Sequence, residues 1–288
     1  MKDIYNYIDE NIEEYISDLQ ELIRKPSVSA QNIGLEECAE FVKNQMHKDG
    51  LPAELHEIPG GPPLVFGHLK SSLSKKTLFC YSHYDVQPPE PIEKWSHGGP
   101  WSVALVDNVI YGRGATDNKG GLLAFNKAAK AFLEVRGEVP LNLKFFYEGE
   151  EEIGSVHLGP WVEQNKKLLE ADGMHCLDGT VDTFAKVPEV ELGLKSVLFI
   201  ELIARGGSKD IHSLNFPLVP SPPWEIVHAL STIMTRDRKI LIKDWYEGLY
   251  ELGEEEINLL NEKNERVDLS ALKKEFGIEK FVLDREGV

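Results

Sequence analysis

The sequence contains little cysteine. Its 288 residues include three, Cys38, Cys80 and Cys176, and no two of them form a C-x-x-C pair. A sparse, odd set of cysteines excludes a disulfide framework and predicts buried, reduced thiols of the kind found in cytosolic proteins. We therefore expect a cytoplasmic chain.

Positive charge and long apolar runs are also scarce. Lys and Arg number 31 against 48 Asp and Glu, which gives a net charge of −17. Nucleic acids and anionic membranes attract basic surfaces, so we expect neither as a partner. No apolar run approaches the length of a membrane span, and residues 1–25 lack the basic-then-apolar order of a secretion signal.

What the sequence does contain is a change of periodicity along the chain. Apolar residues recur at helical spacing over residues 4–23 and 35–48. Short apolar runs typical of buried strands then cover residues 76–86 and 141–149, with an Ala- and Leu-rich helical stretch between them at 120–135. Strand, helix and strand in this order predict an α/β fold with a mostly parallel sheet and flanking helices.

The later part of the chain has a plainer pattern, with no repeat or low-complexity tract. Its predicted elements are a short strand over residues 173–179, a long β-type run over 195–207, a proline-initiated helix over 221–235 and charged helical sequence from Lys239. We place a domain boundary near Gly193, because the pattern changes there from strands that end in acids to a plain strand followed by a helix. The predicted domains are residues 1–193 and a partial α+β domain over 194–288.

Candidate metal ligands follow the ends of the predicted strands. The stretch FFYEGEEEIGS, residues 145–155, places four carboxylates after an aromatic strand, although neighbouring acids repel one another. His83 and Asp85 follow a second strand, and Asp178 follows a third. Asp117 lies in a glycine-rich loop before a helix. Because the carboxyl ends of parallel strands border one crevice, we expect these side chains to converge on a metal ion.

These residue types suit the hydrolysis of an amide bond. At neutral pH this reaction needs an activated water, a Lewis acid for the developing oxyanion and a proton carrier, and two zinc ions sharing a carboxylate supply the first two. Zinc accepts imidazole nitrogen and carboxylate oxygen, and a carboxylate beside the metal can move the proton. In His83-Tyr84-Asp85, the acid can hold the second N–H of the imidazole, an arrangement that orients metal-bound histidines.

Five motifs resemble one family. SHYDVQP, YGRGATDNKGG, FYEGEEEIGS, CLDG and KDIHS occur in the order seen in the co-catalytic zinc exopeptidases of the carnosinase and dipeptidase group, related to acetylornithine deacetylases and succinyl-diaminopimelate desuccinylases. The resemblance covers nearly the whole chain and implies a catalytic domain followed by a lid through which homodimers form. It also implies two zinc ions per site, with manganese or cobalt as alternatives, and a small peptide or N-acyl amino acid as substrate.

The resemblance assigns roles by position. It implies metal ligands as follows: the first zinc is bound by His83 and Asp178, the second by Glu152, and both by Asp117. Glu151 resembles the general base, and Asp85 the residue that orients His83. His212 resembles the histidine that the lid presents to the substrate carbonyl.

One residue indicates the branch of the family. The carboxylate for the first zinc is Asp178, as in the dipeptidase branch, whereas deacetylases and desuccinylases tend to carry Glu. We therefore expect cleavage of dipeptides or short peptides. Removal of an acyl group from an N-acyl amino acid is the alternative.

The sequence departs from the family at the second zinc. There the family uses a further histidine from a part of the catalytic domain that follows the lid. After Asp178 this sequence has only His212 and His228, and His228 is typical of an ordinary helix residue. Zinc sites normally hold at least three protein ligands, so a weakened second site is expected. The second hypothesis is therefore a truncated or split product, non-catalytic alone, that still binds metal or pairs with a completing piece.

Other residues of the same types have ordinary interpretations. Glu148 and Glu150 match no functional position and are interpreted as solvated acids. Cys80 and Cys176 lie on predicted strands, so we expect both to be buried by packing. A structural role within the lid is the alternative for His212. No role in the site is expected for His47, His56, His68, His97, His157 and His175.

Overall fold

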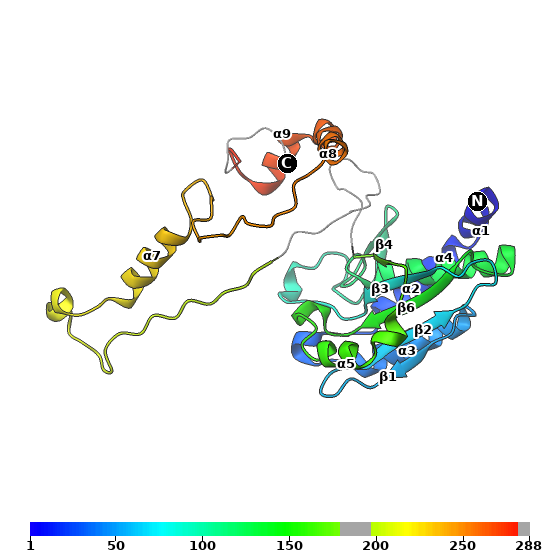
Figure 1. Ribbon diagram of the computed structural model, residues 1–288. Helices are drawn as coiled ribbons and strands as arrows, with labels where there is room; N and C mark the ends of the chain where they lie inside the picture. Colours follow the sequence, from blue (N-terminus) through cyan, green and yellow to red (C-terminus); the bar gives the residue numbers. More distant parts are fainter. Residues whose placement is uncertain (179–196, 282–288) are drawn as a thin grey trace. The chain divides into compact units, whose positions relative to one another are not determined.

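The computed structural model describes residues 1–178 and 197–281 and divides the chain into two units, Met1–Thr180 and Val181–Val288 (Figure 1). Each unit is described by itself. The predicted boundary near Gly193 falls outside the described residues, so it stays a prediction.

A five-stranded sheet forms the centre of the first unit. Its strands, in spatial order, are β1 (Glu54–His56), β2 (Leu64–Leu69), β6 (Asn142–Glu148), β3 (Thr77–His83) and β7 (Gly173–Cys176). Strands β6, β3 and β7 are parallel, whereas β2 is antiparallel to both of its neighbours. Only β2 therefore runs against the common direction, and the predicted mostly parallel sheet is confirmed.

Helices cover both faces of the sheet because its strands alternate apolar side chains between two cores. Val65 and Phe145 face one core, which they share with three helices: α2 (Ile12–Ile23), α3 (Leu35–Lys48) and α4 (Lys119–Arg136). Phe66 and Phe146 face the other, where Trp161 packs from the helical pair α5 (Leu158–Gln164) and α6 (Lys166–Leu169). The resulting three layers, with β-strands between helices, are visible in Figure 1.

The predicted N-terminal helix over residues 4–23 is interrupted. The structure has α1 (Lys2–Glu10) and α2, separated at Asn11. The Asn11 side chain donates a hydrogen bond of 2.7 Å to the Tyr7 carbonyl and so competes with helical backbone bonding. By contrast, α3 covers the predicted range. The short elements of this unit are η1 (Ser29–Gln31), η2 (Ile92–Lys94), η3 (Glu151–Ile153) and the hairpin of β4 (Ala104–Val106) and β5 (Val109–Tyr111).

The described residues of the second unit contain helices and no strand. These are η4 (Ser213–Leu218), α7 (Pro222–Ile233), α8 (Glu254–Arg266) and α9 (Leu269–Phe276). Helix α7 and the charged helices confirm their predictions. The predicted β-type run over 195–207 is wrong for residues 197–207, which form no strand. Val197 and Phe199 there are about nine-tenths exposed, so no core receives this segment.

Candidate metal centre

The candidate site is centred on His83, the last residue of β3. Its imidazole is fully buried, and Nδ1 lies 3.2 Å from Asp85 Oδ1 and 3.1 Å from the Asp85 carbonyl oxygen. These acceptors assign the proton to Nδ1 and leave Nε2 with a free lone pair. Nε2 is buried and has no hydrogen-bond partner among the described residues. A buried nitrogen without a partner requires an explanation, and a bound ligand is one.

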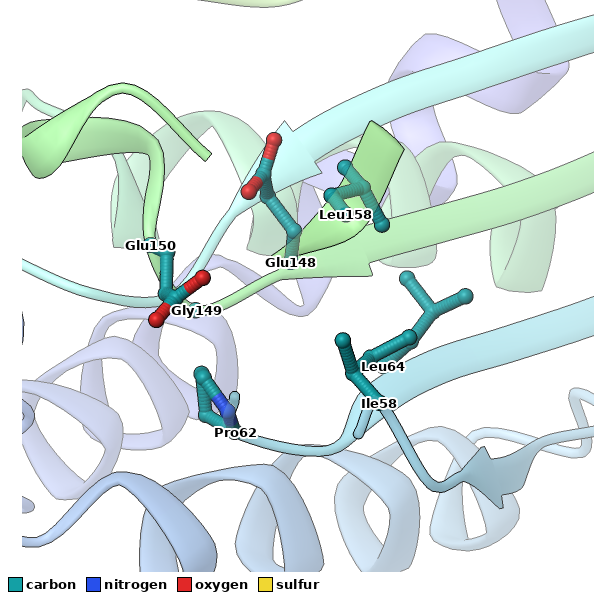
Figure 2. Close-up of a pocket in the computed structure, with 7 residues that line it drawn as sticks. All are labelled: Ile58, Pro62, Leu64, Glu148, Gly149, Glu150 and Leu158. Atoms are coloured by element: carbon teal, nitrogen blue, oxygen red, sulfur yellow. The ribbon is translucent and has the colours of Figure 1, made fainter. Parts of the chain in front are cut away.

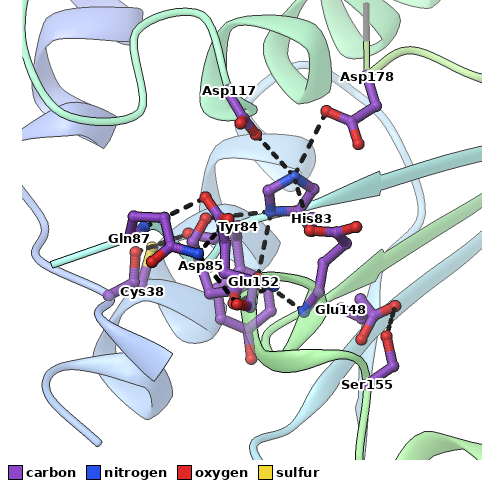
Figure 3. A network of polar contacts seen from close by, with 12 residues as sticks. Cys38, His83, Tyr84, Asp85, Gln87, Asp117, Glu148, Glu152, Ser155 and Asp178 are labelled. Carbon is purple, nitrogen blue, oxygen red and sulfur yellow. Dashed lines mark hydrogen bonds and ion pairs between the residues drawn. The ribbon is translucent and has the colours of Figure 1, made fainter. Parts of the chain in front are cut away.

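Two carboxylates from other segments face that nitrogen (Figure 3). Asp117, in the loop before α4, places Oδ1 3.0 Å from Nε2 of His83, and Asp178, just after β7, places Oδ1 3.6 Å away. The three ligand atoms lie within 4.8 Å of one another. Donors around tetrahedral zinc, with bonds of about 2.0–2.1 Å, lie roughly 3.3 Å apart. We call these three residues the His83 cluster, and it has the spacing of a metal site.

The turn after β6 brings glutamates to this cluster. Glu151 Oε2 lies 3.9 Å from Nε2 of His83, and its carboxylate accepts no hydrogen bond from the described residues. Asp85 fixes the turn, because its carboxylate accepts hydrogen bonds from the backbone N–H groups of Glu151 (3.2 Å) and Glu152 (3.1 Å). One buried carboxylate therefore orients both the imidazole and the segment that carries Glu151.

Glu152 lies outside the His83 cluster. Its Oε1 accepts a hydrogen bond of 3.2 Å from the backbone N–H of Gln87, and its Oε2 accepts one of 2.9 Å from the Gln87 side chain. The same side-chain amide also donates to the Glu152 carbonyl at 3.0 Å. No group of three closely spaced potential metal ligands among the described residues includes Glu152. Sequence reasoning gave Gln87 no role, although its place in SHYDVQP, two residues after Asp85, was a usable signal.

Glu148 and Glu150 are buried, so their interpretation as solvated acids is wrong. Glu148 is 4% exposed, and its Oε1 accepts hydrogen bonds from the hydroxyls of Tyr81 (2.6 Å) and Ser155 (2.7 Å). Glu150 is 8% exposed and pairs with Nδ1 of His157 at 2.9 Å. A run of acids does not reveal which of its side chains point inward, because that depends on how the turn folds back to place Ser155 and His157 and on Tyr81 from β3.

A small cavity borders the same turn (Figure 2). Its volume is about 10 Å³, and it is lined by Ile58, Pro62, Leu64, Glu148, Gly149, Glu150 and Leu158. That volume suits roughly one water molecule. The cavity is therefore part of the packing around the buried acids and is too small for a peptide.

Close packing also holds Asp117 and Asp178 near each other. A Cβ atom on Gly121, in the first turn of α4, would lie 2.2 Å from Oδ1 of Asn118 and 2.3 Å from the carbonyl oxygen of Leu177. Only glycine allows the helix after Asp117 to contact the backbone just before Asp178. The sequence had indicated only that glycines in this loop permit tight turns.

Burial and neighbouring charges shift several pKa values at the site. Burial acts to lower the pKa of His83, but the carboxylates of Asp178 and Asp85 outweigh it and raise that pKa to about 11. Burial raises the pKa values of Glu151 and Glu152. Contact with His83 lowers the pKa of Asp178. Without a metal these acids therefore favour a protonated His83, and a cation bound at Nε2 would replace that proton.

The residues of the His83 cluster fit a divalent metal ion. The buried, unpaired Nε2 of His83 is a nitrogen donor, and the two aspartates are oxygen donors of the kind that zinc accepts. Among the described residues, Asp117, Glu151 and Asp178 form ion pairs with His83 and with no lysine or arginine. No lysine or arginine of the described residues therefore occupies the place that a metal would take.

A second group of acids has similar spacing but a different environment. We call Glu14, Asp18 and Asp49 the Asp18 cluster. Lys127, itself buried, contacts both aspartates at 2.5 and 2.7 Å. The cluster is also contacted by Lys48 and Lys130. Lysines already neutralise these acids, so we assign no metal to them.

His212 and Cys176 complete the predicted residues. His212 is exposed at the start of η4, where its Nδ1 accepts a hydrogen bond of 3.1 Å from the Leu214 N–H. It belongs to the second unit, so its role at the site stays a prediction. Cys80 is buried as expected, but the expectation for Cys176 is wrong because it is exposed. Cys176 lies on β7, which ends the strand order of the described sheet and has a neighbour on one side only.

Comparison with known proteins identifies relatives. The family described as Peptidase family M20/M25/M40 matches residues 79–234. The chain is similar to the Cys-Gly metallodipeptidase dug1 of Schizosaccharomyces pombe, with 33% identity over 266 residues, covering 86% of this chain and 55% of the relative. It is also similar to the Beta-Ala-His dipeptidase of Homo sapiens, with 28% identity over 307 residues, covering 99% and 59%.

Among solved structures, the M20 family metallo-carboxypeptidase Sso-CP2 from Sulfolobus solfataricus matches with a TM-score of 0.81 and 34% identity, covering 95% of this chain and 61% of that protein. The chain thus spans a little over half the length of these relatives. No helix in the described parts of the chain is long and apolar enough to cross a membrane. The family match covers more than half of the sequence and includes the His83 cluster, so the chain belongs to peptidase family M20/M25/M40, as its motifs predicted.

Proposed function

We propose that this chain is a metal-dependent hydrolase that cleaves the amide bond of dipeptides or short peptides. Two relatives that align over 86% and 99% of the chain are named dipeptidases. The observation that carries the proposal is the unpaired, buried Nε2 of His83, which faces Asp117 and Asp178 with Glu151 3.9 Å away.

The site residues would divide the work as follows. A zinc ion held by His83, Asp117 and Asp178 would supply a Lewis acid and activate water, and manganese or cobalt suits the same donors. Asp85 keeps the proton on Nδ1 of His83, so that Nε2 retains its lone pair for the ion. Glu151, whose carboxylate is free of hydrogen-bond donors from the described residues, takes a proton from the attacking water and passes it to the leaving amine.

The second unit would complete the enzyme in two ways. His212 would donate a hydrogen bond to the substrate carbonyl, and the exposed apolar side chains of this unit, such as Trp224 and Leu230, would help two copies to pair. We place the enzyme in the cytoplasm, consistent with its free cysteines. The tests are light scattering for the dimer and a comparison of His212→Ala with His228→Ala, since both histidines are exposed in the second unit.

The function is tested by supplying the purified chain with Zn²⁺, Mn²⁺ or Co²⁺ and a panel of dipeptides and N-succinyl or N-acetyl amino acids. We expect dipeptide cleavage to exceed removal of acyl groups. Glu151→Gln should lower the rate about 10²- to 10⁴-fold without loss of metal, because the proton carrier is removed. Preference for acyl substrates would favour the deacylase alternative. Metal binding with no hydrolysis of any substrate would favour the non-catalytic product.

A further inference from the structure

The acids around His83 are unequally available to a metal. Asp117 and Asp178 retain, besides their contacts with the imidazole, side-chain exposures of 61% and 29%. Glu152, which the resemblance assigns to a second zinc, has a hydrogen-bond donor of Gln87 on each carboxylate oxygen. Three donors therefore have the spacing of a metal site, whereas the carboxylate of Glu152 is hydrogen-bonded to Gln87.

A second ion would have few ligands here. Asp117 would have to be shared with the first ion, and Glu152 would be the remaining donor, although it belongs to no closely spaced group of ligands among the described residues. Zinc sites normally have at least three protein ligands. The described residues thus fit one ion well and do not fit a pair.

We propose that the described residues of this chain form a one-metal centre. His83, Asp117 and Asp178 are its three protein ligands, one position stays open on the side of Glu151, and Gln87 holds Glu152 outside the coordination sphere. Three protein ligands with an open fourth position is the arrangement of catalytic zinc sites. This inference rests on the metal ligands of the proposed function, but not on hydrolysis.

The test counts ions on the purified full chain. The metal-free protein is titrated with Zn²⁺ by calorimetry, bound metal is analysed after dialysis, and the absorption of a Co²⁺ titration is followed. We expect saturation at one ion per chain. Glu152→Gln should leave the affinity within about threefold, whereas Asp178→Asn should lower it by about 100-fold or more, because loss of a ligand exceeds the 10- to 100-fold effect of a supporting residue.

Controls separate the outcomes. Glu163→Gln replaces an exposed acid that pairs with Lys166 on the surface, so it should behave as the wild type. If Asp178→Asn fails to fold, Asp117→Asn takes its place. Two ions of similar affinity, one of them lost in Glu152→Gln, would overturn the inference, as would the absence of any tightly bound ion. A chain that binds one ion and cleaves no dipeptide would instead overturn only the proposed function.

Discussion

The described residues of the first unit contain two clusters with metal-ligand spacing, and their surroundings differ. A buried lysine, Lys127, bonds two of the three carboxylates of the Asp18 cluster. The His83 cluster includes an imidazole whose Nε2 has no hydrogen-bond partner in the described part of the chain. Spacing alone therefore does not distinguish a structural ion-pair network from a metal site. The presence or absence of a lysine among the carboxylates does.

The largest effect is expected from removing Lys127, the buried lysine that contacts the Asp18 cluster. Lys127→Met would leave buried Asp18 and Asp49 without their shared partner, and breaking a buried pair costs about 3–5 kcal/mol. Urea denaturation measures this as a drop in the free energy of unfolding. The matched change Lys166→Met, at a pair with Glu163 in which both side chains are exposed, should cost no more than about 1 kcal/mol. Equal losses of unfolding free energy in Lys127→Met and Lys166→Met would contradict a special role for the buried lysine.

The next largest effect is expected from metal binding at the His83 cluster, which should stabilise the folded protein. Zinc at 100 times its Kd should add about 2.7 kcal/mol to the free energy of unfolding, because the ion binds the folded state. Asp117→Asn should abolish most of this gain. Lys127→Met, if it folds, should retain the gain, since its cluster takes no metal. A zinc effect that disappears in Lys127→Met and persists in Asp117→Asn would reverse our assignment of the two clusters.

A smaller effect is expected at the close contact that brings Asp117 and Asp178 together. Gly121→Ala places a Cβ atom 2.3 Å from the Leu177 carbonyl oxygen, and such overpacking costs about 1–3 kcal/mol. The change should also weaken zinc binding, which calorimetry measures. Gly159→Ala in α5 meets no atom within 4 Å and serves as the control. Unchanged zinc affinity in Gly121→Ala would show that this contact does not set the ligand spacing.

The smallest effect is expected on the pH dependence of stability in the acid range. Burial acts to raise the pKa of Asp18, but Lys127 and Lys48 lower it below the ordinary value of 3.8. Because the folded pKa is the lower one, the ionised group stabilises the fold above its unfolded pKa, and this contribution is lost as pH falls through the folded pKa. Unfolding free energies measured from about pH 6 to about pH 2 should therefore fall less steeply in Asp18→Asn than in wild type. Identical slopes would contradict this account.

The sequence predicted the sheet and the convergence of ligands for a simple physical reason. Parallel strands end at one edge, so acids after separate strands must lie near one another, and His83, Asp117 and Asp178 do. Orientation was not predictable in the same way. Glu148 and Glu150 point inward because Tyr81 from β3 and Ser155 and His157 from the following turn provide hydrogen-bond partners there. The pairing of Gln87 with Glu152 likewise depends on tertiary contact.

The predicted run over 195–207 failed for a different reason. Its apolar side chains suit a strand, but a strand forms only against a partner, and the described second unit offers none to residues 197–207. Helices α7, α8 and α9 were predicted more successfully because helical hydrogen bonds are local.

The placement of Asp85 has a consequence for variation in this protein. Its carboxylate contacts the ring of His83 and the amides of Glu151 and Glu152 at once. Any shift between the ends of β3 and β6 must therefore stretch one of these bonds, which links the position of the His83 ring to that of Glu151, the proposed proton carrier. Substitutions that move His83 without Glu151, or Glu151 without His83, should therefore occur at residues other than Asp85.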